Sequence, residues 1–263
     1  MDHPAADQPQ VGLFVTCLVD LFRPNVGFSA VDLLEEAGCR VSVPPAQTCC
    51  GQPAYNSGDR GDTRDIAEQV IAAFETFDYV VAPSGSCAAM VKKHYPGLFQ
   101  TGSDWHQRAE ALSAKTFELV SFLTDVMALD RVKATFDGSV TYHDSCSGLR
   151  ELGIQRQPRQ LLGAMDGVTV CEMKDPDVCC GFGGTFCVKY SDISNAIVEK
   201  KTANIEAANA DLLLAGDLGC LLNMAGKLKR EGKSTQVRHV AEVLAGRTDV
   251  PPLGDQAAKE HAS

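Results

Sequence analysis

Two Cys-Cys-Gly triplets constrain this chain more than any other feature of its sequence. The first is Cys49-Cys50-Gly51, and the second is Cys179-Cys180-Gly181. The side chains of neighbouring cysteines point in different directions, so the two rarely form a disulfide with each other. A glycine directly after the pair lets the backbone adopt a positive φ angle and approach a bulky group closely. The triplets therefore indicate two binding sites, or two halves of one site.

Further cysteines flank the triplets with a repeated spacing. Cys17 and Cys87 flank the first triplet, and Cys146 and Cys220 flank the second. Corresponding cysteines of the two sets are offset by 129 to 133 residues. A near-constant offset over four positions indicates an internal duplication. The chain is therefore expected to consist of two related halves.

Short apolar runs alternate with helical segments in both halves. Residues 11–16, 79–82 and 212–215 are examples of runs that are typical of buried strands. The alternation predicts an α/β fold made of two pseudo-symmetric, Rossmann-like halves. Each half is expected to be a parallel sheet with helices on its faces and one CCG motif. Residues 117–123 and 237–244 are predicted to form the last helix of each half.

The duplication also predicts how the chain is divided. We expect the first half at residues 11–134 and the second at residues 135–247, with residues 248–263 as a disordered tail rich in proline, alanine and charge. In parallel α/β folds, ligands bind at the sheet edge where the strands end. The four cysteines of each half are expected to converge at that edge.

The composition argues against several classes of function. The net charge is −10 and there is no long basic run, so nucleic acids and acidic membrane surfaces are poor partners. The sequence has no secretory signal and no apolar segment of the roughly 20 residues that span a bilayer. We therefore expect a cytoplasmic protein without membrane insertion. Structural disulfides are disfavoured in that compartment, so the eleven cysteines indicate metal or redox chemistry.

Four converging thiolates suit a soft metal, either in an iron–sulfur cluster or as zinc. Compact zinc sites usually contain local C-x₂₋₄-C pairs, and this sequence has none. Long gaps and adjacent cysteines favour a multi-iron cluster, because adjacent cysteines can reach different iron atoms. The predicted metal and cofactor ligands form two sets: Cys17, Cys49, Cys50 and Cys87 in the first half, and Cys146, Cys179, Cys180 and Cys220 in the second.

These motifs resemble the cysteine-rich (CCG) domain that is shared by heterodisulfide reductase, the glycolate oxidase iron–sulfur protein and the LutA/YkgE lactate-utilisation proteins. The resembling stretches are Phe14–Cys17, Cys49–Ala54, Ser84–Cys87, Cys179–Phe186 and His239–Leu244. The resemblance to the LutA/YkgE family is close and extends over most of the chain. It implies an iron–sulfur electron-transfer subunit of a three-protein complex that oxidises L-lactate to pyruvate. The implied partners are a ferredoxin-like iron–sulfur protein and a third, smaller subunit.

The sequence differs from the heterodisulfide reductase motif at one position in each half. In that relative each motif ends in Cys-x-x-Cys, whereas here Ser84 stands three residues before Cys87 and Asp217 three before Cys220. Each half thus offers four of the five ligands that the relative's non-cubane cluster uses. Either Ser84 or Asp217 donates an oxygen, or the cluster is a simpler type such as a four-iron, four-sulfur cluster.

The chain contains no G-x-G-x-x-G motif after a strand, so we find no dinucleotide site. Removing two electrons from a hydroxy acid normally needs a hydride acceptor such as a flavin or nicotinamide. The chain is therefore expected to relay electrons as a non-catalytic or co-catalytic subunit of an oxidoreductase. Two alternatives stay open: a thiol/disulfide reductase-like enzyme in which a CCG cysteine reacts, and a zinc-stabilised scaffold without a redox role.

Three further cysteines and His143 are not part of the predicted ligand sets. Cys39 and Cys171 lack counterparts at the repeat offset, so we expect small core residues there. Cys187 follows its triplet closely and is a spare thiol that we do not expect to be a ligand. His143 precedes Cys146 by three residues and could ligate a metal or carry protons. We expect it to be a structural, hydrogen-bonded histidine.

Overall fold

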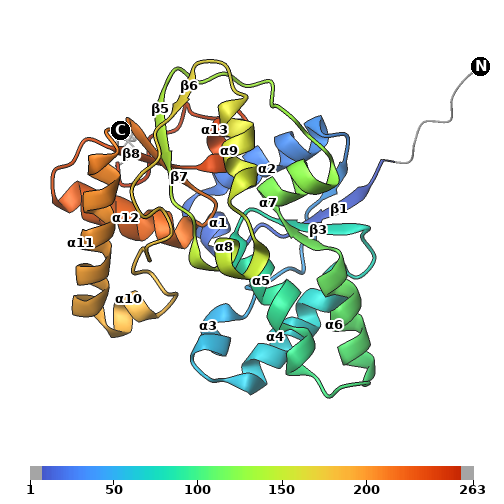
Figure 1. The fold of residues 1–263 in the computed structure, drawn as a ribbon. Coiled ribbons are helices and arrows are strands. Elements are labelled where there is room, and N and C mark those ends of the chain that lie inside the picture. Colours follow the sequence, from blue (N-terminus) through green and yellow to red (C-terminus); the bar gives the residue numbers. More distant parts are fainter. Residues whose placement is uncertain (1–7, 256–263) are drawn as a thin grey trace, which may run out of the picture.

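Two parallel four-stranded sheets organise the protein, as the computed structural model of residues 8–255 shows (Figure 1). The strand order is β2-β1-β3-β4 in the first half and β6-β5-β7-β8 in the second. The identical order confirms both the α/β fold and the duplication. The strands are β1 (Gln10–Leu13), β2 (Arg40–Ser42), β3 (Tyr79–Ala82), β4 (Thr116–Glu118), β5 (Gly138–Tyr142), β6 (Val168–Val170), β7 (Leu212–Ala215) and β8 (Gln236–His239).

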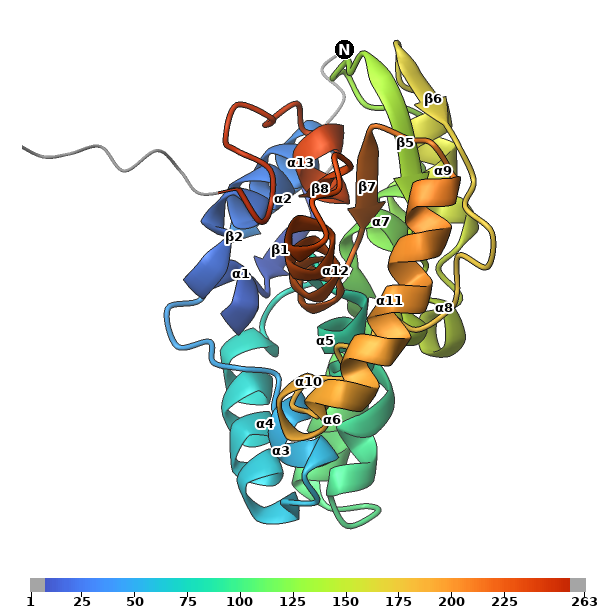
Figure 2. The ribbon, with the colours of Figure 1, turned by 90° about the vertical axis from the view of Figure 1, so that its left-hand side faces the viewer.

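Helices connect the strands and pack around the sheets (Figures 1 and 2). Those of the first half are α1 (Cys17–Phe22), α2 (Pro24–Glu36), α3 (Gln52–Asn56), α4 (Arg60–Phe74), α5 (Gly85–Ala89), η1 (Met90–His94), η2 (Pro96–Leu98), α6 (Asp104–Ala114), α7 (Leu119–Ser121) and η3 (Phe122–Val126). Those of the second half are α8 (Cys146–Leu152), α9 (Arg156–Gly163), α10 (Phe186–Lys189), α11 (Ser191–Ala207), α12 (Leu218–Arg230) and α13 (Val240–Leu244). Within residues 8–255, no helix combines the length and the apolar character needed to cross a membrane.

Sequence periodicity explains the longer helices. In α4, Ala67, Val70, Ile71 and Phe74 recur at helical spacing and are fully buried. The side chain of Asp59 caps the helix by accepting a hydrogen bond from the backbone N–H of Asp62. The same apolar periodicity places α4 against the first sheet, which orders the chain that follows the first CCG triplet.

The two halves share their largest hydrophobic core. This core combines buried side chains of the first half, such as Leu33 and Leu123, with side chains of the second, such as Leu161 and Leu214. Buried polar contacts reinforce it. Arg23 Nε donates to the buried Glu242 carboxylate at 2.8 Å. Because the core is continuous, the positions of the two sheets are fixed relative to each other.

The predicted last helix of each half begins with a strand. Residues 116–118 form β4 and residues 236–239 form β8. The prediction that the last helices begin at residues 117 and 237 was therefore wrong. Each strand passes directly into a helix, whose N-cap is Glu118 in the first half and His239 in the second. No glycine or proline separates strand from helix, which is why the sequence pattern concealed the strands.

The start of the expected disordered tail is packed against the second half. The backbone N–H of Leu253 donates to the carbonyl of Val237 at 2.8 Å, and the Leu253 side chain contacts the core. The expectation of disorder therefore does not hold for residues 248–255. Residues 256–263 lie outside the described part of the chain.

Candidate metal centre

All eight predicted ligands lie near the carboxyl edges of the two sheets. Cys17 and Cys146 are the first residues of α1 and α8, which follow the first strand of each sheet in chain order. Cys87 and Cys220 are each the third residue of a helix, α5 and α12 respectively. The CCG triplets occupy the loops after β2 and β6. The repeat therefore places corresponding cysteines at corresponding points of the two folds.

The structure brings the cysteines together in the two predicted sets. In the first cysteine group, Cys17 Sγ lies 3.8 Å from Cys49 Sγ, and Cys50 makes side-chain contacts with Cys49 and Cys87. All members are free thiols.

The second cysteine group repeats this chain of contacts. Cys179 makes side-chain contacts with Cys146 and with Cys180, and Cys180 contacts Cys220. These members are also free thiols. In each group, successive contacts thus link four sulfur atoms. Sulfur donors of this kind suit a soft metal or an iron–sulfur cluster.

The glycines of the two triplets have the same backbone conformation. Gly51 and Gly181 both have φ of +81°, a left-handed conformation that other residues adopt at a cost. A Cβ atom on Gly181 would also lie 2.7 Å from the carbonyl oxygen of Ser194. On Gly51 its nearest neighbour would be a side-chain methyl group of Ile66 at 3.3 Å. The glycine is therefore required by the fold in both triplets, and most strictly in the second.

The carbonyl group of the second cysteine is also held in each triplet. Tyr95 Oη donates to the carbonyl of Cys50 at 2.9 Å. Asn223 Nδ2 donates to the carbonyl of Cys180 at 2.7 Å. Tyr95, between η1 and η2, and Asn223, in α12, thus fix the same backbone group. The directions of the cysteines are therefore set by the fold itself.

Contacts among the thiols change their acidity. Hydrogen bonds from Cys17 and Cys50 lower the pKa of Cys49 to about 2. In the second group, hydrogen bonds from Cys146 and Cys180 lower the pKa of Cys179 to about 2.

The pKa values of the thiols that donate these bonds change in the opposite direction. The pKa of Cys50 rises because its proton is engaged by Cys49 and Cys87 and because the group is buried. Each group by itself therefore favours one thiolate among thiols that keep their protons. Full ionisation of four neighbouring thiols requires a nearby cation, which a bound metal supplies.

Cavities adjoin both cysteine groups between the halves. One of about 210 Å³ borders the first group, and one of about 280 Å³ borders the second. Five residues line both cavities: Gln52, Ser86, Gly184, Asp217 and Gly219. The two cysteine groups therefore face the same region of the molecule, although they belong to different sheets.

Ser84 and Asp217, the two residues that replace a cysteine of the related motif, contact each other. Ser84 Oγ donates to Asp217 Oδ1 at 2.8 Å, and Ser86 donates to the same oxygen through its N–H at 3.1 Å and its hydroxyl at 2.7 Å. This contact joins α5 of the first half to the start of α12 in the second. Asp217 Oδ2 is buried without a hydrogen-bond partner in the described structure.

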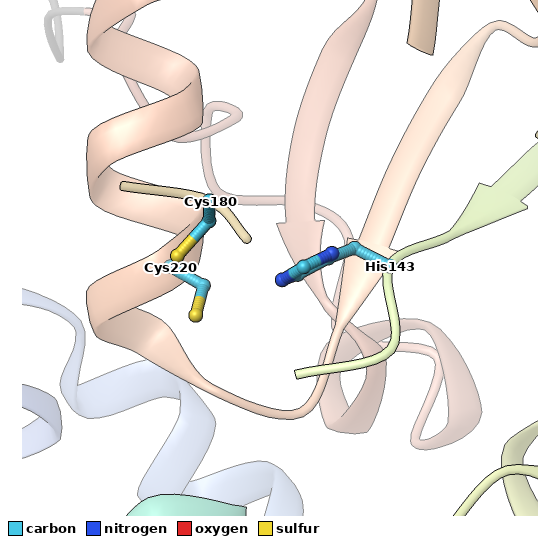
Figure 3. Close-up of side chains that lie close together, drawn as sticks. All are labelled: His143, Cys180 and Cys220. Atoms are coloured by element: carbon cyan, nitrogen blue, oxygen red, sulfur yellow. The ribbon is translucent and has the colours of Figure 1, made fainter. Parts of the chain in front are cut away.

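His143 lies directly after β5, beside the second cysteine group. One ring nitrogen of His143 and the sulfur atoms of Cys180 and Cys220 lie within 4.8 Å of one another (Figure 3). The ring is fully buried, and this burial lowers the pKa of His143 to about 3. The imidazole is therefore neutral at physiological pH. The expected structural hydrogen bond is present, between Nδ1 and the carbonyl of Pro176 at 3.2 Å.

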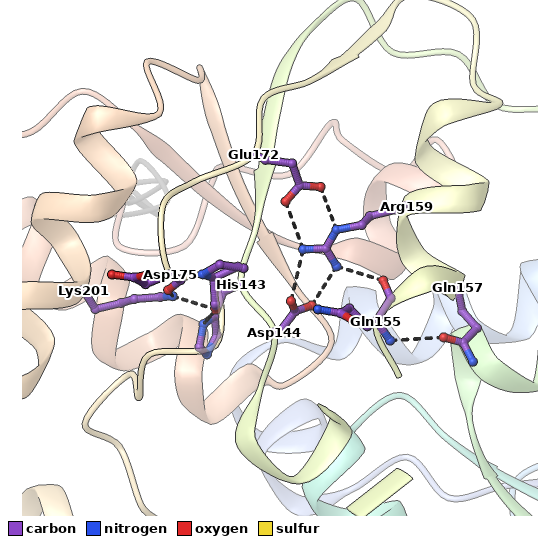
Figure 4. A network of polar contacts seen from close by, with 9 residues as sticks. His143, Asp144, Gln155, Gln157, Arg159, Glu172, Asp175 and Lys201 are labelled. Atoms are coloured by element: carbon purple, nitrogen blue, oxygen red, sulfur yellow. Dashed lines mark hydrogen bonds and ion pairs between the residues drawn. The ribbon is translucent and has the colours of Figure 1, made fainter. Parts of the chain in front are cut away.

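A charged network lies beside His143 (Figure 4). Arg159 forms ion pairs with the buried Asp144 at 2.8 Å and with Glu172 at 2.6 Å. Lys201 is fully buried. The sequence gives no sign of this burial, because Lys201 is one of several charged residues in the long helix α11. Burial lowers its pKa to about 8.

The remaining cysteines lie outside the two groups. Cys39 is buried in the shared core with its sulfur 3.8 Å from Met127 Sδ, as expected for a core residue. Cys171 is partly buried after β6. Cys187 Sγ contacts the carbonyl of Gly184 at 3.5 Å, near the second cavity.

Known proteins share this pattern over nearly the whole chain. The profile of the cysteine-rich CCG domain matches residues 11–92 and 140–225, one match in each half. "Lactate utilization protein A" of Geobacillus sp. (strain WCH70) is 48% identical over 238 residues, which cover 90% of this chain and 100% of the relative. "Lactate utilization protein A 2" of Bacillus cereus (strain AH820) is 46% identical over 236 residues, covering 90% and 98%.

A solved structure shares the fold at low sequence identity. The crystal structure of a hypothetical protein from Helicobacter pylori has a TM-score of 0.59 and 13% identity, and the match covers 96% of this chain. This chain spans half the length of that protein. Because both halves match the CCG domain and relatives are nearly half identical, the chain belongs to the lactate utilization protein A family of cysteine-rich (CCG) domain proteins.

Proposed function

We propose that this chain is the iron–sulfur electron-transfer subunit of a complex that oxidises L-lactate to pyruvate. The observation that carries the proposal is the presence of two groups of four contacting thiols at corresponding sheet edges. The lactate role is supported by relatives that are named for lactate utilization and are covered almost completely by this chain. The proposed location is the cytoplasm.

The donor sets fit the proposed cofactor. In each group, four thiolates would hold a cluster: Cys17, Cys49, Cys50 and Cys87 in one, and Cys146, Cys179, Cys180 and Cys220 in the other. An iron–sulfur cluster supplies one-electron transfer when bound. The positive φ of Gly51 and Gly181 forms the turn that follows each cysteine pair. Tyr95 and Asn223 hold that backbone in place.

The chain is proposed to relay electrons and to leave hydrogen abstraction at lactate C2 to another subunit. Its sequence has no dinucleotide motif that would bind a hydride acceptor. The proposed partners are a ferredoxin-like iron–sulfur protein and a third, smaller subunit. Purified chain that oxidised lactate alone with a dye acceptor would contradict this division of roles.

The test is metal analysis of protein purified without oxygen. Iron, zinc and acid-labile sulfide are measured, and the dithionite-reduced protein is examined by electron paramagnetic resonance (EPR). The variants Cys50→Ser and Cys180→Ser each disrupt one group, and Cys171→Ser is the matched control because Cys171 lies outside both groups. Iron and sulfide in similar amounts, reduced by either group variant but not by the control, support the proposal.

A thiol redox function is the second candidate, and the acidity of Cys49 and Cys179 favours it. Hydrogen bonds from the neighbouring thiols lower the pKa of both cysteines and so favour the ionised, nucleophilic form. This function predicts rapid alkylation of one of the two residues in the native, iron-free protein. Bound zinc in a colourless anaerobic sample would instead indicate the scaffold role. Either result, without iron and sulfide, would refute electron transfer.

A further inference from the structure

His143 has a buried ring nitrogen that the described structure leaves without a partner. Its side chain is fully buried, and Nε2 makes no hydrogen bond within residues 8–255. A buried polar atom without a partner costs about 1–3 kcal/mol. Native folds rarely accept this cost unless another group satisfies the atom. Nε2 therefore indicates a binding partner in its immediate surroundings.

The hydrogen bond of the other ring nitrogen determines which tautomer is present. The carbonyl of Pro176 can only accept, so Nδ1 of His143 must carry the proton in this 3.2 Å contact. Lys201 Nζ donates to the same carbonyl at 2.7 Å and to the carbonyl of Asp175 at 3.2 Å (Figure 4). Both contacts fix the carbonyl and therefore the ring. Nε2 of the neutral ring offers a lone pair, as in metal-bound histidines whose Nδ1–H bonds to a carbonyl.

The free nitrogen is directed at the second cysteine group. Figure 3 shows the far end of the His143 ring turned toward the sulfur atoms of Cys180 and Cys220. The three candidate ligand atoms lie within 4.8 Å of one another. A thiol is a weak hydrogen-bond donor, and these two sulfur atoms form no hydrogen bond with Nε2. The arrangement suits nitrogen and sulfur donors that share a soft metal.

The first half shows that the fold does not need a histidine here. Phe14 is the corresponding residue: its N–H donates to the carbonyl of Val81 on β3 at 2.8 Å, just as the N–H of His143 donates to Leu214 on β7 at 2.9 Å. Phe14 packs edge-on against Phe74, with ring centroids 5.4 Å apart. An aromatic pair thus fills the position without a buried orphan nitrogen. A purely structural role does not explain the polar ring of the second half.

We propose that His143 is a ligand, through Nε2, of the metal or cluster bound by the second cysteine group. The first site then binds through sulfur alone, and the second through sulfur and nitrogen. The inference rests on the metal binding that is part of the proposed function, and it is independent of lactate. Because ligand type controls the electron affinity of a metal centre, the duplicated fold holds two inequivalent sites.

The test detects nitrogen at the metal by pulsed EPR on anaerobically purified full-length protein. Two samples are compared, one with natural histidine and one with ¹⁵N-labelled histidine, in each redox state that is paramagnetic. The Cys50→Ser variant removes the first site, so that the remaining signal comes from the second. The Cys180→Ser variant leaves the first site for comparison. We expect a histidine nitrogen coupling in Cys50→Ser protein and none in Cys180→Ser protein.

Two histidine variants assign the coupling. His143→Phe introduces the residue that the first half already uses, and it should abolish the coupling. His94→Gln is the matched control, because His94 also lines the second cavity but is paired with Glu151 at 2.7 Å. The coupling should survive in this control. The labelling comparison needs no histidine variant, so it decides the question even if His143→Phe does not fold.

The outcomes separate this inference from the proposed function. Iron at the second site without a histidine coupling overturns the inference and leaves electron transfer standing. A coupling that survives His143→Phe overturns it as well. Absence of iron and zinc from both sites would refute metal binding and the inference together.

Discussion

Glu118 is a buried carboxyl group whose ionisation should weaken the fold measurably. It ends β4, is 3% exposed, and its Oε2 accepts a hydrogen bond from the N–H of Ser121 at 3.0 Å. Burial, which disfavours the charged form, raises the pKa of Glu118 from 4.5 to about 7 despite that hydrogen bond. The nearby Asp217 carboxylate raises it further.

The direction of the pH effect follows from the two pKa values. Between pH 4.5 and about 7, the unfolded chain loses the Glu118 proton while the folded chain keeps it. Stability is therefore greatest below the lower value and is lost as the pH rises through the upper one. At about 1.4 kcal/mol per pKa unit, the loss in unfolding free energy is about 3 kcal/mol.

The substitution Glu118→Gln isolates this contribution, because glutamine mimics the protonated carboxyl group. Urea unfolding of the metal-free, reduced chain is measured from pH 5 to pH 8.5. We expect the variant to gain most of the 3 kcal/mol relative to wild type across this range. Glu110→Gln, at a carboxylate whose side chain is 60% exposed, controls for the change in net charge. A stability difference between Glu118→Gln and wild type that is independent of pH would refute the reasoning.

Three further predictions use the same unfolding measurement. Gly181→Ala should cost at least about 1–2 kcal/mol from its left-handed backbone alone, and more than Gly51→Ala, because the new methyl group meets a backbone oxygen only at Gly181. Asp217→Ala should cost about 1–3 kcal/mol because Ser84 and Ser86 lose their shared acceptor, whereas Asp217→Asn should cost less because Oδ1 remains an acceptor. Wild type should become more stable relative to Lys201→Met as the pH rises above about 8, since the unfolded lysine holds its proton up to its usual pKa of 10.5.

Features set by the duplication were predictable from the sequence. The grouping of the eight cysteines followed from a near-constant offset, and the strands β3 and β7 were placed correctly because their apolar runs are uninterrupted. The strands β4 and β8 were missed because each leads into a helix without a break. Spacing therefore reveals what lies at strand ends, but it does not separate a short strand from the helix that follows it.

Contacts between the halves could not be predicted, because they depend on how the two sheets pack. The pairing of Ser84 with Asp217 joins residues that are far apart in sequence, and no spacing rule connects them. The orphan nitrogen of His143 likewise becomes visible only when its surroundings are known. One signal was available: at the repeat offset the first half has Phe14 where the second has His143. A polar residue in place of an aromatic core residue marks where the two halves differ.

The two halves agree where the backbone is constrained and differ where side chains face the cysteines. The strand order and the φ of the triplet glycine are the same in both. The group that holds the second cysteine's carbonyl is Tyr95 in one half and Asn223 in the other. This is the pattern expected if the fold must present four sulfur atoms in a fixed arrangement while each site is adjusted separately. Residues from both halves line both cavities. A side-chain change at the shared wall therefore alters the surroundings of both cysteine groups, whereas a change at His143 alters those of one.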